Sequence, residues 1–119
     1  LEHYHLRCLA VSQNSRFLLV AGQTSKEPNG PSYPFVSLFF KQKSEEYCLR
    51  ATAVITDMST TFTYIQFMPK NQNNYIYMKV FDLEGSLAVF RTNLISFERV
   101  FHHEKFHDGR VNCLDYDQN

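Results

Sequence analysis

Residues 5–14 read HLRCLAVSQN, and residues 110–119 read RVNCLDYDQN. When the two stretches are superimposed, Cys, Leu, Gln and Asn coincide, and an aliphatic residue stands two positions before each Cys. A weaker third copy, FTYIQFMP at residues 62–69, places Ile65 where the first copy has Leu9, a separation of 56 residues. Self-similarity at such a period is typical of solenoids, propellers and other repeat architectures.

The composition is that of one globular domain. The 119 residues are 44% hydrophobic and 15% aromatic, which is enough for a real core. Twelve basic and twelve acidic residues leave no net charge to attract nucleic acid or an anionic membrane. The longest apolar runs, of about five residues, are far too short to span a bilayer. We therefore expect a soluble, cytoplasmic protein that binds neither nucleic acid nor a membrane.

The three cysteines, Cys8, Cys48 and Cys113, are an odd number at wide spacing, with no Cys-x-x-Cys pair. This pattern favours reduced thiols in the core of an intracellular protein over a disulfide framework. The chain opens on Leu1 and stops within a copy of its own repeat. We therefore expect it to be a fragment of a longer polypeptide.

The residue pattern predicts an all-β fold with almost no helix. Short stretches rich in Val, Ile, Phe, Tyr and Thr alternate with breaks that carry Gly, Pro, Asn and Asp, and no apolar pattern persists at helical spacing. We expect four strands within residues 6–55, four within 62–103 and a further strand in 110–119. Residues 24–34 are predicted to form a long polar loop, because their prolines cannot donate to a sheet ladder.

Two four-strand units, with HDGRV at residues 107–111 opening an innermost strand and EGSLAVF at 84–90, resemble WD-repeat β-propellers. The resemblance covers nearly all of the chain but is degenerate. Phe39-Phe40 and Phe90-Arg91 stand in place of the Trp-Asp pair that names the family.

The resemblance implies two antiparallel blades, 6–55 and 62–103, and the first strand of a third at 110–119. Blades of this kind stack around a central channel, so the remaining blades of the parent chain would complete the ring. The residues to which this arrangement gives a structural role are Gly22, Glu84 in place of the family's structural Asp, Gly85, His107 and Gly109.

Within the family, LAVS at 9–12, VAGQ at 20–23 and PFV at 34–36 look most like echinoderm microtubule-associated-protein-like and cilia- and flagella-associated WD-repeat proteins. This likeness implies a non-enzymatic protein-protein interaction scaffold that needs no cofactor. It also implies tubulin or axonemal complex subunits as partners, and a location on the cytoskeleton or in the axoneme of a cilium or flagellum.

Residues 24–34 are the candidate partner contact, because ordered loops on rigid scaffolds are frequent contact sites and aromatic side chains anchor many interfaces. The residues expected to contribute are Lys26, Asn29, Tyr33 and Phe35. The alternative is an insertion that the fold tolerates.

His102, His103 and His107 are weak candidates for metal ligands, because imidazole nitrogens bind zinc well. The alternatives are hydrogen bonding within a blade, which suits His107, or exposure to solvent. No residue has the setting of a catalytic nucleophile.

The aromatic residues Tyr64, Tyr75, Tyr77 and Phe81 allow two interpretations. They could stack nucleic-acid bases, but such sites add basic residues along the phosphates, and few are near. Packing between sheets is the favoured interpretation.

Two other proteins fit parts of this pattern. A self-contained β-sandwich binding module would suit nine strands in a chain of this length. A metal-dependent enzyme would use the histidine cluster, and a stoichiometric zinc content would identify it.

Overall fold

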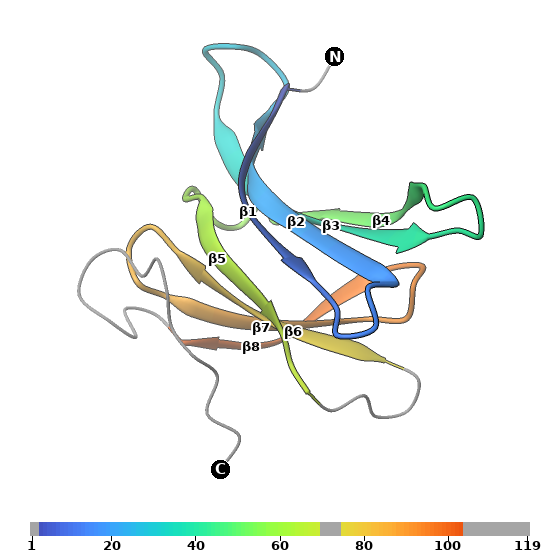
Figure 1. The fold of residues 1–119 in the computed structure, drawn as a ribbon. Coiled ribbons are helices and arrows are strands. Elements are labelled where there is room, and N and C mark those ends of the chain that lie inside the picture. The colour runs from blue at the N-terminus through green and yellow to red at the C-terminus, as the bar shows by residue number, and fades with distance from the viewer. Residues whose placement is uncertain (1–2, 70–74, 104–119) are drawn as a thin grey trace.

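The computed structural model of the chain describes residues 3–69 and 75–103, and this part of the chain is all-β, as predicted. Its strands form two four-stranded antiparallel sheets (Figure 1). The first sheet contains β1 (His3–Val11), β2 (Phe17–Ser25), β3 (Ser32–Lys41) and β4 (Tyr47–Val54). The second contains β5 (Phe62–Phe67), β6 (Ile76–Asp82), β7 (Leu87–Thr92) and β8 (Phe97–His103). The strand expected at 110–119 lies outside the described residues.

No helix occurs in these described segments, so none of them offers a helix long and apolar enough to cross a bilayer. Each sheet is a simple meander in which every strand pairs with the next one along the chain. Side chains hold the tight turns between strands. The β1–β2 turn is fixed by Asn14, whose Oδ1 accepts hydrogen bonds from the Ser12 hydroxyl at 2.7 Å and from the Arg16 N–H at 3.0 Å.

The long polar loop predicted for residues 24–34 is wrong in length. β2 continues to Ser25 and β3 begins at Ser32, and Pro34 pairs with Gln23 inside the sheet. The carbonyl of Pro34 accepts from the Ile55 N–H at 2.9 Å, on the β4 side, and both polar backbone groups of a strand residue point to the same neighbour. The nitrogen of Pro34, which carries no hydrogen, therefore faces the side where β4 ends. The pairing of Pro34 with β2 needs no N–H group from the proline.

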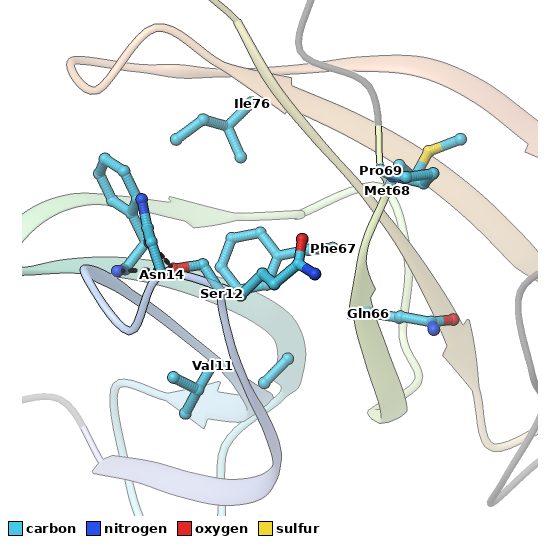
Figure 2. Close-up of a pocket in the computed structure, with 11 residues that line it drawn as sticks. Val11, Ser12, Asn14, Gln66, Phe67, Met68, Pro69 and Ile76 are labelled. Atoms are coloured by element: carbon cyan, nitrogen blue, oxygen red, sulfur yellow. Dashed lines mark hydrogen bonds between the residues drawn. The ribbon is translucent and has the colours of Figure 1, made fainter.

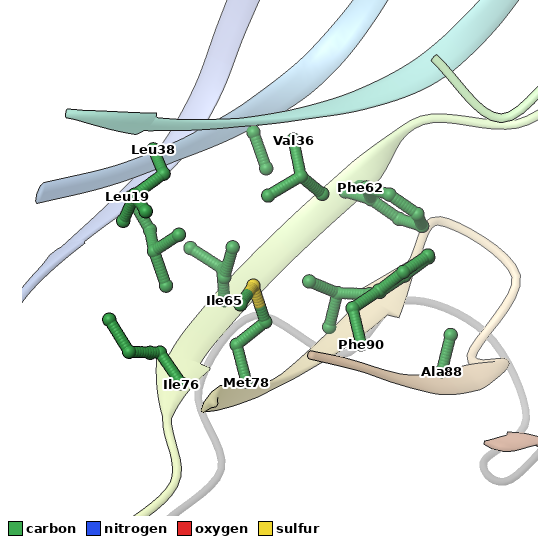
Figure 3. Close-up of a cluster of buried hydrophobic side chains, with 11 residues drawn as sticks. Leu19, Val36, Leu38, Phe62, Ile65, Ile76, Met78, Ala88 and Phe90 are labelled. Carbon is green, nitrogen blue, oxygen red and sulfur yellow. The ribbon is translucent and has the colours of Figure 1, made fainter. Parts of the chain in front are cut away.

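The two sheets pack face to face around one apolar core (Figure 3). Leu19, Ala21, Val36 and Leu38 reach from the first sheet toward the second. The second sheet contributes Phe62, Ile65, Ile76, Met78, Val80, Ala88 and Phe90. β1 and β5, the first strands of the two sheets, lie next to one another (Figure 1).

The two sheets carry β-bulges at corresponding places. In β1 the pairing with β2 shifts between Leu6 and Cys8, and in β5 the pairing with β6 shifts between Phe62 and Tyr64. Leu6 therefore corresponds to Phe62, and the separation of 56 residues is the one that relates Leu9 to Ile65 in the sequence.

The last two strands of each sheet repeat the same irregularity. The β3–β4 register shifts between Leu38 and Phe39, and the β7–β8 register shifts between Val89 and Phe90. Phe39 and Phe90 thus occupy equivalent positions, and the same registers leave Arg50 in β4 and Val100 in β8 as the extra residues.

The bulge of β1 depends on Gly22, which lies within β2 opposite Leu6 and not at the end of its strand. A Cβ atom at this position would be 1.9 Å from the carbonyl oxygen of His5. Tyr4 and Phe35 flank the site, and their rings meet edge to face with centroids 4.9 Å apart. Gly22 therefore permits a close approach of two backbones.

Candidate functional site

The β2–β3 loop, residues 26–31, borders a hollow of about 460 Å³. Its lining brings together two residues expected to contact a partner, Lys26 and Tyr33, with Val54 and Thr56 at the end of β4. Lys26 is exposed and Tyr33 is half-buried, so a partner can reach both. Asn29 is exposed on the same loop but does not line the hollow.

Phe35, the fourth residue expected at this contact, is only 1% exposed. It lies in β3, opposite Gly22 of β2 and against the ring of Tyr4, so it supports the sheet and does not present itself to a partner. Thr24 pairs with Tyr33 in the sheet and also lines the hollow. Its buried hydroxyl has no hydrogen-bond partner in the described part of the chain.

A larger groove, of about 790 Å³, opens between the two sheets where β1 and β5 end (Figure 2). On one side it is lined by the β1–β2 turn, with Ser12 and Asn14, and on the other by Gln66, Met68 and Pro69. No lining residue is charged. Amides and a hydroxyl between apolar walls can bind neutral polar groups such as a peptide backbone, but they offer no acid or base.

Sequence reasoning did not point to this groove, although a signal for it exists. The residues at 10–13 and 66–69 that line it occupy equivalent places in two copies of the opening repeat. Because β1 and β5 lie side by side, the ends of the two copies meet. A repeat that starts each sheet therefore places its own copies around one groove.

The histidines do not gather into a described site. His3, His5 and His102 are all exposed, and among residues 3–69 and 75–103 no three potential ligands form a group that could hold a metal. The side chain of His103, together with His107 and Gly109, lies outside the described residues. The metal-ligand hypothesis for His102, His103 and His107 stays a prediction.

Cys8 packs at the junction of the sheets. Its sulfur lies 3.9 Å from the carbonyl oxygens of both Ala21 and Phe62, and burial raises its pKa to about 12. The thiolate is the reactive form of cysteine, so this thiol is chemically inert at neutral pH. Cys8 acts as a packing residue, as the sequence predicts.

The β6–β7 turn contains Glu84 and Gly85, for which the sequence predicts structural roles. Gly85 has a φ of 87°, which suits glycine, whereas Glu84 is exposed. The carboxylate that holds the turn belongs to Asp82, whose Oδ1 accepts from the N–H groups of Glu84 at 2.9 Å and Ser86 at 2.8 Å. The aspartate sits two residues earlier than Glu84, where it closes an Asx-type turn.

The face of the second sheet that is directed away from the first is aromatic and charged. Arg91 on this face bonds Glu98 at 2.6 Å, and its guanidinium lies 4.5 Å from the ring centroid of Tyr75. Tyr64 and Phe81, predicted as packing residues, also lie on it, with ring centroids 6.0 Å apart. Lys79 is buried among these strands, which does not suit a residue that tracks phosphates.

The face of the first sheet that is directed away from the second, hereafter the outer face of the first sheet, is apolar. Strand register and the bulges place on it six large apolar side chains that are exposed: Tyr4, Leu6, Leu9, Val11, Leu49 and Val54. Beside them lie Leu18, Val20 and Phe39. The nearest charged residues along the strands are the exposed bulge residues Arg7 and Arg50 and, where β3 meets its turn, Lys41. Large contiguous apolar surfaces of this kind mark interaction sites.

Comparison of the chain with models of known protein families, with curated proteins and with solved structures finds no match.

Proposed function

We propose that the two sheets are consecutive blades of a WD-repeat-like propeller, and that the protein is a protein-protein interaction scaffold without chemistry of its own. The observation that carries this proposal is that the two sheets stack in the same direction, so that the faces they turn toward each other are not equivalent. The side chains of the first sheet that reach the core, such as Leu19, correspond to side chains of the second sheet that point away from it, such as Lys79. Conversely, Ile65 and Val80 in the core correspond to Leu9 and Val20 on the outer face of the first sheet.

This arrangement favours a propeller over a β-sandwich. The two sheets of a sandwich bury their inner faces against each other and close one core. When two sheets stack in the same direction, the outer face of the first sheet and the outward face of the second sheet are different surfaces, and both stay open. Further sheets can then add to each open surface until the stack closes into a ring. The remaining blades of a longer parent chain would provide that closure in a propeller.

Three features of the described residues support the proposed scaffold role. The groove between β1 and β5 has no charged lining residue, and Cys8 is inert. The hollow at the β2–β3 loop presents the ring of Tyr33, a residue type that is enriched at protein interfaces, beside the polar side chains of Lys26 and Glu27. We propose this hollow and its loop as the partner contact.

Gel filtration and urea unfolding of residues 1–119 test the proposal. A pair of blades without its neighbours is expected to self-associate or to unfold without a single cooperative transition. Joining the chain to flanking blades of its parent protein is expected to restore a soluble, cooperative fold. A monomer that unfolds in one cooperative transition would favour the closed sandwich module and overturn the proposal.

A further inference from the structure

The outer face of the first sheet corresponds to the face of the second sheet that packs against the first sheet. The bulge registers pair Leu6 with Phe62, and the shared separation of 56 residues pairs Leu9 with Ile65. Leu6 and Leu9 are 65% and 63% exposed, whereas Phe62 and Ile65 are 1% and 4% exposed. The two faces are chemically alike. The face with Phe62 and Ile65 is covered by the first sheet, whereas the face with Leu6 and Leu9 is exposed.

The likeness extends into the middle of each sheet. Val20 corresponds to Val80, Leu18 to Met78 and Phe39 to Phe90. The outer face of the first sheet therefore has the apolar composition of a surface that, in the second sheet, packs against the first sheet.

We infer that the outer face of the first sheet binds a further four-stranded antiparallel sheet from outside residues 1–119, stacked in the direction in which the first sheet stacks on the second. The occupant is expected to present an uncharged aliphatic face like the one formed by Leu19, Ala21, Val36 and Leu38. This inference rests on the same-direction stacking that the proposed function uses, and it adds the surface and the chemistry of its partner.

Charge argues against a second copy of this chain as the occupant. The free face that a second copy would present in this stacking is the outward face of its second sheet, which carries Lys79, Arg91 and Glu98. These positions correspond to Leu19, Phe40 and Cys48 in the first sheet. Leu19 is fully buried in the core, so the same stacking would place the ammonium group of Lys79 against the apolar outer face of the first sheet, which is unfavourable.

A chain with a duplicated first sheet tests the inference, because it supplies an occupant of known sequence. Residues 3–61 are placed before residue 6 of the full chain, so that the native link 55–61 leads into β1 as it leads into β5 in the natural order. The added sheet then offers Leu19, Ala21, Val36 and Leu38 to the outer face of the original first sheet.

Leu9→Glu is introduced into the single chain and into the original first sheet of the duplicated chain. Leu9 is mostly exposed in the single chain, so the urea concentration at which half of its β-sheet signal is lost is expected to change little there, whether or not that loss is cooperative. In the duplicated chain the carboxylate would be buried, and the midpoint is expected to fall by about 1 M. Ile95→Glu, in the exposed β7–β8 turn, is the matched control and is expected to change neither midpoint.

Equal, small effects of Leu9→Glu in both chains would overturn the inference, as would a duplicated chain that unfolds no more cooperatively than the single one. Sedimentation velocity of the single chain tests whether a second copy of the chain occupies the face instead. If it is an oligomer that Leu9→Glu converts to a monomer, a second copy occupies the face and the inference is overturned. The proposed function fails on a different result, namely a closed, cooperative monomer of residues 1–119.

Discussion

Gly22 is the residue at which the first sheet has no room for a side chain. A Cβ atom there would be 1.9 Å from the carbonyl oxygen of His5, a backbone atom that can move only if β1 moves. Gly22→Ala is therefore expected to lower the free energy of unfolding by about 1–3 kcal/mol, as overpacking of a core does. Urea denaturation of the chain joined to flanking blades of its parent protein, followed by circular dichroism, measures this loss.

Gly30→Ala is the matched control for Gly22→Ala. A Cβ atom added at Gly30 would lie 3.3 Å from the Cβ of Glu27, so the exposed loop that carries both residues would have to shift by only a few tenths of an ångström. A smaller loss is expected than at Gly22. Equal losses for the two variants would mean that the approach of β1 to β2 does not constrain the sheet.

At the scale of single residues, the sequence predicted the role of the turn glycine Gly85 but not the carboxylate that forms the hydrogen bonds of the turn. Gly85 was expected to have a structural role, and its φ of 87° is a conformation that glycine adopts readily in a turn. The role of Asp82 was missed, because resemblance assigned the structural acid to Glu84 and the hydrogen bonds of Asp82 run to backbone groups. Which carboxylate faces those N–H groups depends on the geometry of the turn, and only the assembled hairpin determines that geometry.

Among the elements, the link between β4 and β5 is tied to β8 by an ion pair. Both carboxylate oxygens of Asp57 accept from the guanidinium of Arg99, with Oδ1 at 3.1 Å from Nη1. The hydrogen bond from Arg99 lowers the pKa of Asp57 below its ordinary value of 3.8. The stability that this pair contributes is thus present above pH 3.8 and is lost as the pH falls through the lower pKa of the folded state.

Asp57→Asn is expected to be slightly less stable than the natural protein at pH 7, because the pair is exposed. The difference should shrink as the pH falls below 3.8 and vanish once Asp57 is protonated. Thermal unfolding at a series of pH values measures both. Glu46→Gln, an exposed carboxylate in the β3–β4 turn, serves as the control. A difference that persists at the lowest pH would show that the ion pair is not its cause.

The positions of the strands followed from the sequence, because runs of Val, Ile, Phe and Tyr between turn residues are local signals. The segment at 24–34 was mispredicted for a non-local reason. Whether Pro34 can stand in a strand depends on where β4 ends, and only the assembled sheet determines this. The stacking of one sheet on the other depended likewise on contacts between Cys8 and Phe62, 54 residues apart.

At the scale of the whole molecule, the resemblance to microtubule-associated WD-repeat proteins makes polymerised tubulin a partner to test. Residues 1–119 are expected to co-sediment with stabilised microtubules. Tyr33→Ala, in the hollow at the β2–β3 loop, is expected to weaken binding roughly tenfold, as the loss of an aromatic anchor does.

Lys43→Glu, in the exposed β3–β4 turn, is the control for co-sedimentation and should bind as the natural chain does. A pelleted fraction no greater than that without microtubules would exclude tubulin as a partner of this segment. The scaffold proposal would then need a different protein at the same hollow.

The candidate contact was predictable only in part. Lys26 and Tyr33 do share a hollow, because a loop brings neighbours in sequence together. Phe35 was placed there by its type, and its burial under Tyr4 depends on the absence of a side chain at Gly22. The groove between β1 and β5 is built from segments more than 50 residues apart, which no local pattern reveals.

The four bulges all lie in edge strands: β1 and β4 of the first sheet, and β5 and β8 of the second. A regular edge strand is a template on which another chain can add a strand and begin an amyloid-like stack. An extra residue interrupts the row of free N–H and C=O groups and twists the edge away. In the first sheet the extra residues are Arg7 and Arg50, whose charges oppose strand addition further. These sheets can therefore join neighbours through their faces while their edges resist aggregation.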